Sequence, residues 1–327
     1  MSDLPRVTII TPSFNQGIYL EKTICSVLEQ DYPNLEYIIV DGGSTDNSLE
    51  IIRRYEQRLA WWVSEKDRGQ SDAINKGLAR ATGEIVAWLN SDDFYLPGAV
   101  FSAVTALQEH ADWGMVYGDM LAVDGEGALL NIQRFGDWDL DDLLCFRILG
   151  QPSVFLRKSV LDRAGALDTR FHYLLDHHLW IRMAMLAPIG HIPQFLAAAR
   201  FHATAKNVAK ASAFGEDAYD IVRWMQTQPN LINRFQRLKR KIWAGAHWIN
   251  ARYLSEGGMP GVSLQAFWRS FRCDPRVVLR DWRRLLFTTL LLFGGKDVRS
   301  LYLKYRQRRQ LRHLDPAIVT LLYQEKR

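Results

Sequence analysis

Two adjacent carboxylates follow a short apolar run in the N-terminal half of the chain. The run covers residues 85–89, is partly β-branched and is preceded by Gly83, as is typical of a buried strand. Asp92 and Asp93 follow it almost at once, and neighbouring carboxylates repel each other unless a positive charge lies beside them. Hard divalent cations prefer oxygen ligands and often share them with phosphates. The pattern therefore predicts a site for a divalent cation, and the alternative is an ordinary solvated turn.

Length and cysteine usage limit the class of protein. A chain of 327 residues is long enough for about two domains. Its three cysteines (Cys25, Cys145 and Cys273) lie far apart and form no CxxC pair, which excludes a disulfide framework and a cysteine-rich zinc site. The first residues lack the basic segment, apolar core and cleavage site of a secretory signal. We therefore expect a cytoplasmic protein.

Charge is distributed unevenly along the chain. Residues 1–214 contain 19 Lys and Arg against 27 Asp and Glu, whereas residues 215–327 contain 22 against 9. Two parts of opposite net charge indicate different partners. We predict one domain over residues 1–213 and a basic, helical region over residues 214–327.

The first 120 residues alternate between strand and helix patterns. Strands are predicted over residues 6–11, 35–40, 60–64, 85–89 and 114–117, with helical patterns between them. This alternation predicts an α/β fold with a doubly wound sheet. Pro12 is expected to end the first strand. Neither G-x-G-x-x-G nor a P-loop motif follows any predicted strand, which excludes the common dinucleotide and P-loop folds.

Six sequence blocks carry a resemblance to a known family. They cover residues 8–15, 40–46, 72–77, 82–84, 89–93 and 175–180. In this order and at these separations they resemble family 2 glycosyltransferases of the nucleotide-diphospho-sugar (GT-A) fold, closest to enzymes of bacterial exopolysaccharide or lipopolysaccharide synthesis. The resemblance extends over residues 6–210. It implies a mixed sheet and a metal-assisted, inverting transfer of a sugar from a nucleotide-diphospho-sugar to an acceptor hydroxyl.

The resemblance assigns a nucleotide pocket to the ends of the first strands. Thr11, Pro12 and Asp41 would line the base pocket, with Asp41 accepting a hydrogen bond from a pyrimidine N–H. Such strand ends are where open α/β sheets bind ligands. Asp67 and Arg68 would close over the base and phosphates, although Arg68 can equally be a solvated cation. A UDP-sugar is the expected donor.

The resemblance also assigns a metal site. Asn90 occupies the position of the first acid in the family's Asp-x-Asp motif, so Asp92 is expected to bind Mg²⁺ or Mn²⁺ directly. Asn90 would act through the ribose or water, and Asp93 would touch the metal or orient the turn. The missing charge predicts weaker metal affinity. His202 is expected near the metal or diphosphate, with a structural histidine as the alternative.

An inverting transfer further needs a general base, whose help is worth roughly 10²–10⁴-fold in rate. Asp176 matches the family's base position, and the alternative is a helix N-cap. Gln151 matches a segment near the acceptor. Trp180 shares a helical face with Asp176, so it is expected near the acceptor sugar or, alternatively, in the core.

The C-terminal region is amphipathic and rich in arginine. A first apolar stripe recurs at helical spacing over residues 231–253, and a second covers residues 264–271. The uncharged run over residues 285–293 is too short to span a bilayer, which takes about 20 residues. Arginine faces opposite Trp and Phe predict contact with a membrane surface. The resemblance implies a saccharide or lipid-linked saccharide acceptor, and a lipid-linked one would explain both the apolar and the basic faces. The alternative is a packed helical subdomain with a solvated basic face.

Two other functions stay open at this point. A sugar-nucleotidyltransferase shares the layered plan, but residues 11–17 lack its glycine-rich phosphate loop. A nucleic-acid-binding protein could use the basic C-terminal region, and its affinity would fall steeply with salt. An inactive, binding-only relative is a further alternative, and the presence of Asp41, Asp92 and Asp176 counts against it. We expect no nucleic-acid partner.

Overall fold

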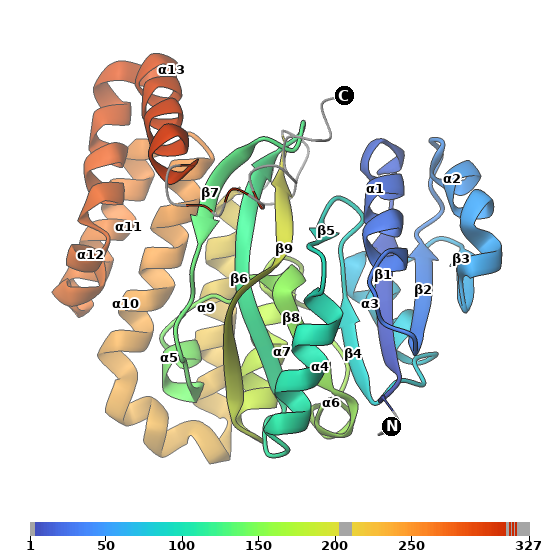
Figure 1. Ribbon diagram of the computed structural model, residues 1–327. Helices are drawn as coiled ribbons and strands as arrows, with labels where there is room; N and C mark the ends of the chain where they lie inside the picture. The colour runs from blue at the N-terminus through green and yellow to red at the C-terminus, as the bar shows by residue number, and fades with distance from the viewer. Residues whose placement is uncertain (1–3, 203–210, 312–313, 315, 317, 319–327) are drawn as a thin grey trace. The chain divides into compact units, whose positions relative to one another are not determined.

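The protein is described by a computed structural model that covers residues 4–202, 211–311, 314, 316 and 318 (Figure 1). The chain divides into two compact units. The first unit contains Met1–Ala122, Gln133–Leu140 and Leu149–Arg200, and the second contains Val123–Ile132, Asp141–Ile148 and the chain from Phe201 onward. The predicted domain boundary between residues 213 and 214 stays a prediction.

Strands and helices alternate through the N-terminal part of the chain, as predicted. The strands are β1 (Val7–Ser13), β2 (Leu35–Asp41), β3 (Trp61–Ser64), β4 (Ile85–Trp88), β5 (Phe94–Tyr95), β6 (Met115–Asp124), β7 (Leu129–Gln133), β8 (Val154–Arg157) and β9 (Ile189–Phe201). The helices are α1 (Gly17–Leu28), α2 (Ser48–Tyr55), α3 (Gln70–Leu78), α4 (Ala99–Glu109), α5 (Leu140–Leu144), α6 (Lys158–Ala164) and α7 (Leu175–Ala184). Short 3-10 turns lie at Glu56–Arg58 and Gln151–Ser153.

The strands form one mixed sheet in the order β3-β2-β1-β4-β8-β6-β9-β5, with β7 beside β6. The four strands β3, β2, β1 and β4 are parallel, and β8 is antiparallel to β4 and β6. Because parallel strands end at the same edge, the turns after β1, β2 and β4 lie at one edge of the sheet. This arrangement confirms the predicted α/β class.

The first strand continues through Pro12 to Ser13, so the prediction that Pro12 ends it is wrong. The pairing of β1 with β2 runs to Ser13 opposite Asp41, whereas its pairing with β4 runs only to Ile10 opposite Trp88. Pro12 therefore lies beyond the stretch in which β1 is paired on both sides. A residue without an N–H is tolerated there because it removes no ladder hydrogen bond on the β4 side.

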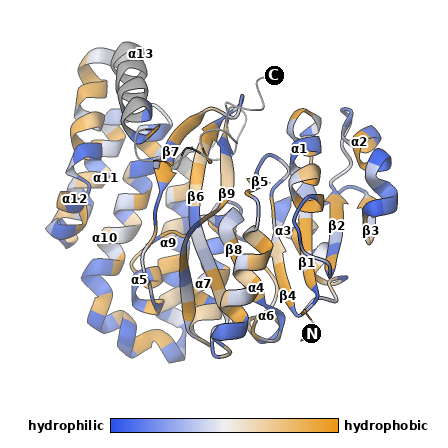
Figure 2. Cartoon of the chain, viewed as in Figure 1, coloured by the Kyte–Doolittle hydropathy of each residue, from blue (hydrophilic) through white to orange (hydrophobic). Residues whose placement is uncertain are grey.

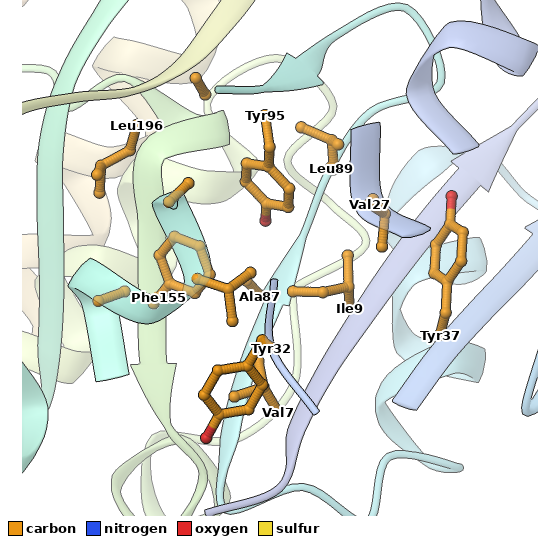
Figure 3. Close-up of a cluster of buried hydrophobic side chains, with 14 of the residues drawn as sticks. Val7, Ile9, Val27, Tyr32, Tyr37, Ala87, Leu89, Tyr95, Phe155 and Leu196 are labelled. Carbon is orange, nitrogen blue, oxygen red and sulfur yellow. The ribbon is translucent and has the colours of Figure 1, made fainter. Parts of the chain in front are cut away.

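The core of the first unit lies against the β1–β4 pair (Figure 3). Val7 and Ile9 on β1 and Ala87 on β4 are fully buried, because alternate residues of a strand face the same side. Helices α1 and α4 contribute further buried residues to the same cluster. Phe155 from β8 stacks on Tyr95 with ring centroids 5.5 Å apart. This packing fixes the strand ends that carry the candidate site.

The second unit is largely helical, as predicted. Its helices include α9 (Ala211–Thr227), α10 (Ile232–Glu256), α11 (Pro260–Cys273), the short α12 (Pro275–Arg280) and α13 (Trp282–Leu311), and a short 3-10 turn lies at Pro229–Leu231. Figure 2 shows apolar and polar residues interleaved along α10. The first predicted stripe is buried at Phe235, Ile242 and Ile249, whereas in the second stripe Trp268 is 60% exposed. Among the described helices, none is long and apolar enough to cross a membrane.

Candidate active site

The turn after β4 presents the two adjacent acids differently. The backbone N–H of Asp93 donates to the carbonyl of Asn90 over 3.0 Å and closes the turn. Asp92 is half-buried, whereas Asp93 is buried with 5% exposure. A tight turn that follows a fully buried strand therefore leaves Asp92 as the more accessible carboxylate.

Asp93 uses both carboxylate oxygens within the protein. Its Oδ1 accepts a hydrogen bond of 2.9 Å from the backbone N–H of Arg200, and its Oδ2 accepts one of 3.2 Å from Nδ2 of Asn90. Burial and then the neighbouring charge of Asp92 raise the pKa of Asp93 well above its ordinary value. Of the two predicted roles for Asp93, this geometry favours orienting the turn over touching a metal.

Arg200 holds the same turn from the last strand of the first unit. Its Nε donates to the carbonyl of Asp92 over 3.0 Å. The guanidinium lies over two aromatic rings, 4.8 Å from the ring centroid of Tyr19 and 5.5 Å from that of Phe94. The sequence alone gave Arg200 no role at this turn, because the pairing of β9 with β5 is what brings the two segments together.

Asn90 is the hub of a side-chain network. Its Oδ1 accepts from Nε2 of Gln70 over 2.7 Å, and its Nδ2 donates to Oε1 of Gln151 over 3.0 Å as well as to Asp93. Gln151 in turn donates from Nε2 to the carbonyl of Trp88 over 2.7 Å. The amide of Asn90 is thus directed at protein groups, which suits a positioning role. Gln70, the first residue of α3, was missed by sequence reasoning.

Asp41 is fully buried at the end of β2 and organises the loop that follows. It accepts hydrogen bonds from the backbone N–H groups of Gly43 (3.1 Å) and Ser44 (2.9 Å) and from the hydroxyls of Ser44 (2.5 Å) and Ser64 (2.7 Å). Gly43 has a φ of +82°, which favours glycine. The carboxylate is fully buried and accepts these four hydrogen bonds, so in this structure it shapes the loop, and its contact with a nucleotide base stays a prediction.

The other predicted nucleotide-pocket residues lie on the neighbouring strand ends. The Thr11 side chain is fully buried and lies 3.0 Å from the Tyr37 hydroxyl, so it faces the core, and the prediction that it lines the pocket holds at most for its backbone. Pro12 beside it is also buried. Asp67 lies against Gly42, where a Cβ atom would be 2.5 Å from its Oδ2. These contacts place Asp67 next to the loop that Asp41 shapes.

Arg68 extends into solvent from the loop before α3. Its side chain is 81% exposed and forms an ion pair of 2.9 Å with Asp72, four residues later. This geometry corresponds to the solvated-cation alternative. An exposed pair of this kind contributes only about 0–1 kcal/mol, so little free energy opposes its release toward a phosphate.

Asp176 is half-buried at the start of α7, in the same unit as the turn after β4. The helix begins at Leu175, and Leu174 occupies its N-cap position, so the alternative in which Asp176 is the N-cap is wrong. Its Oδ1 accepts from the backbone N–H of His177 over 2.7 Å. Leu175 and His177 on either side are buried, which leaves Asp176 as the accessible position of this turn.

Trp180 lies in the core, and the prediction that it contacts the acceptor is wrong for this structure. Its side chain is 1% exposed and stacks on Trp88 with centroids 5.0 Å apart and an interplanar angle of 23°. A buried ring cannot touch a sugar that arrives from solvent. The stack instead fastens α7, and therefore Asp176, to the strand that precedes Asp92.

A cation here would depend on few protein ligands. Among the residues that the structure describes, no three Asp, Glu, His or Cys side chains gather as a metal cluster. Mg²⁺ is often bound by one or two carboxylates together with substrate phosphates, and Asp92 fits that pattern. His202 follows β9 directly, is half-buried and belongs to the second unit, so its metal role stays a prediction.

Comparison with known proteins identifies the family. The family described as Glycosyl transferase family 2 matches residues 8–150. An uncharacterized glycosyltransferase of Mycobacterium tuberculosis is 30% identical over 194 residues, which cover 57% of this chain and 71% of the relative. The chain belongs to glycosyl transferase family 2. A PGL/p-HBAD biosynthesis glycosyltransferase of Mycobacterium bovis is also 30% identical, over 182 residues that cover 54% of this chain and 69% of the relative.

Solved structures share the fold of this family 2 glycosyltransferase. The mannosyltransferase PcManGT from Pyrobaculum calidifontis matches with a TM-score of 0.59 and 21% identity, over 99% of this chain and 88% of its own. TarS of S. aureus in complex with UDP-GlcNAc matches with a TM-score of 0.56 and 16% identity, over 84% and 92% of the two chains. The predicted GT-A fold and glycosyltransferase class are confirmed, and the nucleotidyltransferase and non-enzymatic alternatives fall away.

Proposed function

We propose that this glycosyltransferase moves a sugar from a nucleotide-diphospho-sugar, with UDP as the expected nucleotide, to an acceptor hydroxyl with inversion at the anomeric carbon. The observation that carries the proposal is the fixed turn after β4, where Asn90, Asp93 and Arg200 hold Asp92 at the edge of the sheet. The two structural neighbours support a nucleotide-sugar donor, since TarS was solved with UDP-GlcNAc and PcManGT with GDP-Man and Mn²⁺.

Donor binding is assigned to the edge formed by β1, β2 and β4. The backbone of Thr11 and Pro12 would meet the base, and Asp41 is the proposed acceptor for a base N–H. Asp67 and Arg68 would lie over the phosphates. Gly42 lets the loop backbone lie close to the Asp67 side chain, because it has no Cβ atom. Gly43 adopts the positive φ of the same loop.

Asp92 would hold Mg²⁺ or Mn²⁺ together with the donor's phosphates, with His202 as a second proposed contact. A bound divalent cation stabilises the negative charge that develops on the leaving diphosphate. Asn90 and Asp93 contribute by fixing the Asp92 backbone rather than by adding charge. A single accessible carboxylate predicts modest metal affinity in the absence of donor.

Asp176 is the proposed general base. One of its carboxylate oxygens takes the proton of the acceptor hydroxyl as the acceptor oxygen bonds to the anomeric carbon. The bond from that carbon to the diphosphate oxygen breaks with its electron pair, and the nucleoside diphosphate leaves. Gln151, held by Asn90 and Trp88, is the proposed polar contact beside the acceptor. General-base help contributes roughly 10²–10⁴-fold.

The acceptor is proposed to be a saccharide or lipid-linked saccharide of bacterial cell-surface polysaccharide synthesis. The name of the M. bovis relative, a PGL/p-HBAD biosynthesis glycosyltransferase, supports a biosynthetic acceptor. The corresponding location is the cytoplasm, at the inner face of the plasma membrane. The basic composition of residues 215–327 supports that location.

The test is a screen of nucleotide sugars with Mn²⁺ that measures release of nucleoside diphosphate. Asp92→Ala should abolish turnover, and EDTA should do the same to the wild type until metal is restored. Asp176→Ala should keep donor binding, measured by calorimetry, while transfer to acceptor stops. Asp112→Ala, at an exposed acid of the same unit, serves as the matched control. Near-normal transfer by Asp176→Ala would refute the assignment of Asp176 as the base. Turnover that persists in EDTA would refute the proposed requirement for a metal ion.

A further inference from the structure

Helix α13 exposes an apolar stripe to solvent. Four residues spaced four, four and three positions apart lie on one helical face: Trp282, Leu286, Leu290 and Phe293. Their exposed fractions are 53%, 49%, 45% and 85%. We call these four residues the α13 stripe. Large apolar patches of this kind are rare on monomeric proteins and mark surfaces that bind a partner or a membrane.

The other side of α13 packs within the same unit, through the partly buried Leu285 and through polar groups. Thr288 is fully buried, and its hydroxyl lies 2.8 Å from that of Ser255 on α10. Arg284 donates from Nη1 to Glu256 over 2.7 Å and from Nε to Asp281 over 3.1 Å. An ordinary surface helix buries its apolar face and exposes its polar one. The start of α13 instead buries Thr288 while it leaves the four large apolar side chains of the α13 stripe exposed.

Exposed arginines flank the α13 stripe. Arg280 and Arg283 are exposed immediately before and within its first turn, and Arg276 is exposed on α12. The Arg283 guanidinium lies 5.7 Å from the ring centroid of Trp282. Arginine beside tryptophan and leucine is the composition of helices that lie in a lipid headgroup layer, where the cations meet anionic phosphates and the apolar groups enter the acyl boundary.

Helix α11 carries a second exposed apolar group of the same chemistry. Trp268 and Phe271 stack with ring centroids 5.9 Å apart, and they are 60% and 37% exposed. Arg269 and Arg272 beside them are exposed as well. The same combination of aromatic rings and arginines thus occurs on two helices of one unit.

We propose that the α13 stripe is a docking surface for an anionic lipid bilayer, on which the helix lies in the headgroup plane. Charge complementarity selects this occupant over a second copy of the chain, because two copies would bring exposed arginines against each other. The α13 stripe would be the surface that holds the enzyme at the membrane location proposed above. This docking does not depend on the transfer chemistry.

The test measures binding of the full-length protein to sedimented vesicles of phosphatidylglycerol mixed with phosphatidylcholine, and to vesicles of phosphatidylcholine alone. The wild type should bind the anionic vesicles. The double variant Leu286→Glu/Phe293→Glu should lose at least about tenfold in partitioning, because it places charges at the acyl boundary. Arg280→Gln/Arg283→Gln should lose about fivefold per charge, and only on anionic vesicles.

Phe101→Glu is the matched control, since it charges a 48% exposed aromatic residue on the first unit. Thermal melts establish that each variant folds, and nucleoside diphosphate release without vesicles should equal that of the wild type. Vesicle binding that survives in the stripe variant overturns the proposal. So does a wild-type dimer in sedimentation velocity that the stripe variant converts to a monomer, because a second copy would then cover the stripe. A failed donor screen would leave these results unchanged.

Discussion

The backbone N–H of Arg200 donates a hydrogen bond of 2.9 Å to Oδ1 of Asp93, across 107 positions of sequence. The pairing of β9 with β5, which sets Ala198 opposite Phe94, makes this contact. The same arginine also bonds the carbonyl of Asp92 through Nε. The last strand of the first unit therefore fixes the turn in which we place the cation ligand.

Arg200→Lys should lower activity although it keeps the positive charge. Lysine cannot reproduce the planar contact over Tyr19 or the directed Nε bond to Asp92. We expect kcat to fall about tenfold or more and the free energy of unfolding to fall by about 1–3 kcal/mol. Steady-state kinetics and urea denaturation measure the two effects. Arg163→Lys, at an exposed position on α6, should change neither.

Asn90→Asp restores the acid of the family's metal motif but should destabilise the protein. The Nδ2 group of Asn90 donates to Asp93 and to Oε1 of Gln151, so a carboxylate there would face two acceptors. We expect a loss of about 1–3 kcal/mol in the free energy of unfolding. Asn47→Asp, at the exposed N-cap of α2, is the control and should be neutral or stabilising. Full stability of Asn90→Asp would contradict the network described for Asn90.

His178 should make the folded state sensitive to acid. Burial, followed by the charge of Arg182, lowers the pKa of His178 to about 3. Below about pH 6.5 this histidine takes up a proton in the unfolded chain but not in the folded protein. The contribution of His178 to the free energy of unfolding is therefore fully present above that pH and is lost as the pH falls. Between about pH 6.5 and 5 the loss should be about 2 kcal/mol.

His178→Gln should remove this pH dependence, as measured by urea denaturation at several pH values. The exposed His110 provides the control His110→Gln, which should keep the wild-type slope. An unchanged slope in His178→Gln would show that another group sets the acid sensitivity.

Gly83→Ala should weaken the pairing of β1 with β4. A Cβ atom at Gly83 would lie 2.6 Å from the backbone nitrogen of Thr8 and 2.8 Å from the carbonyl oxygen of Arg6. Backbone atoms of a buried strand cannot move aside cheaply, so we expect a loss of about 1–3 kcal/mol in the free energy of unfolding. In Gly261→Ala the added Cβ atom would meet open space on α11, so this control variant should be neutral or stabilising. Thermal melts of both variants measure the difference.

Local patterns in the sequence were enough to place β1 to β4, whereas β6 runs to Asp124, well past the strand predicted at residues 114–117. The predicted strands at residues 35–40 and 85–89 agree with β2 and β4 to within one residue at each end. The first strand was cut short because the rule about proline depends on which neighbours are paired. Which strands lie beside a segment is decided by the assembled sheet and cannot be read from the segment's own residues.

The sequence by itself determined the α/β class, the helical C-terminal region, and the positions of Asp41 and Asp92 just after strands, because two-residue and 3.6-residue periodicities and turn residues act over a few neighbours. Only the tertiary structure decided that Trp180 is core, that Asn90 joins Gln70 to Gln151, and that Arg200 closes the turn. Those contacts link segments up to 108 residues apart, and they follow from strand order and helix packing, which no local pattern contains.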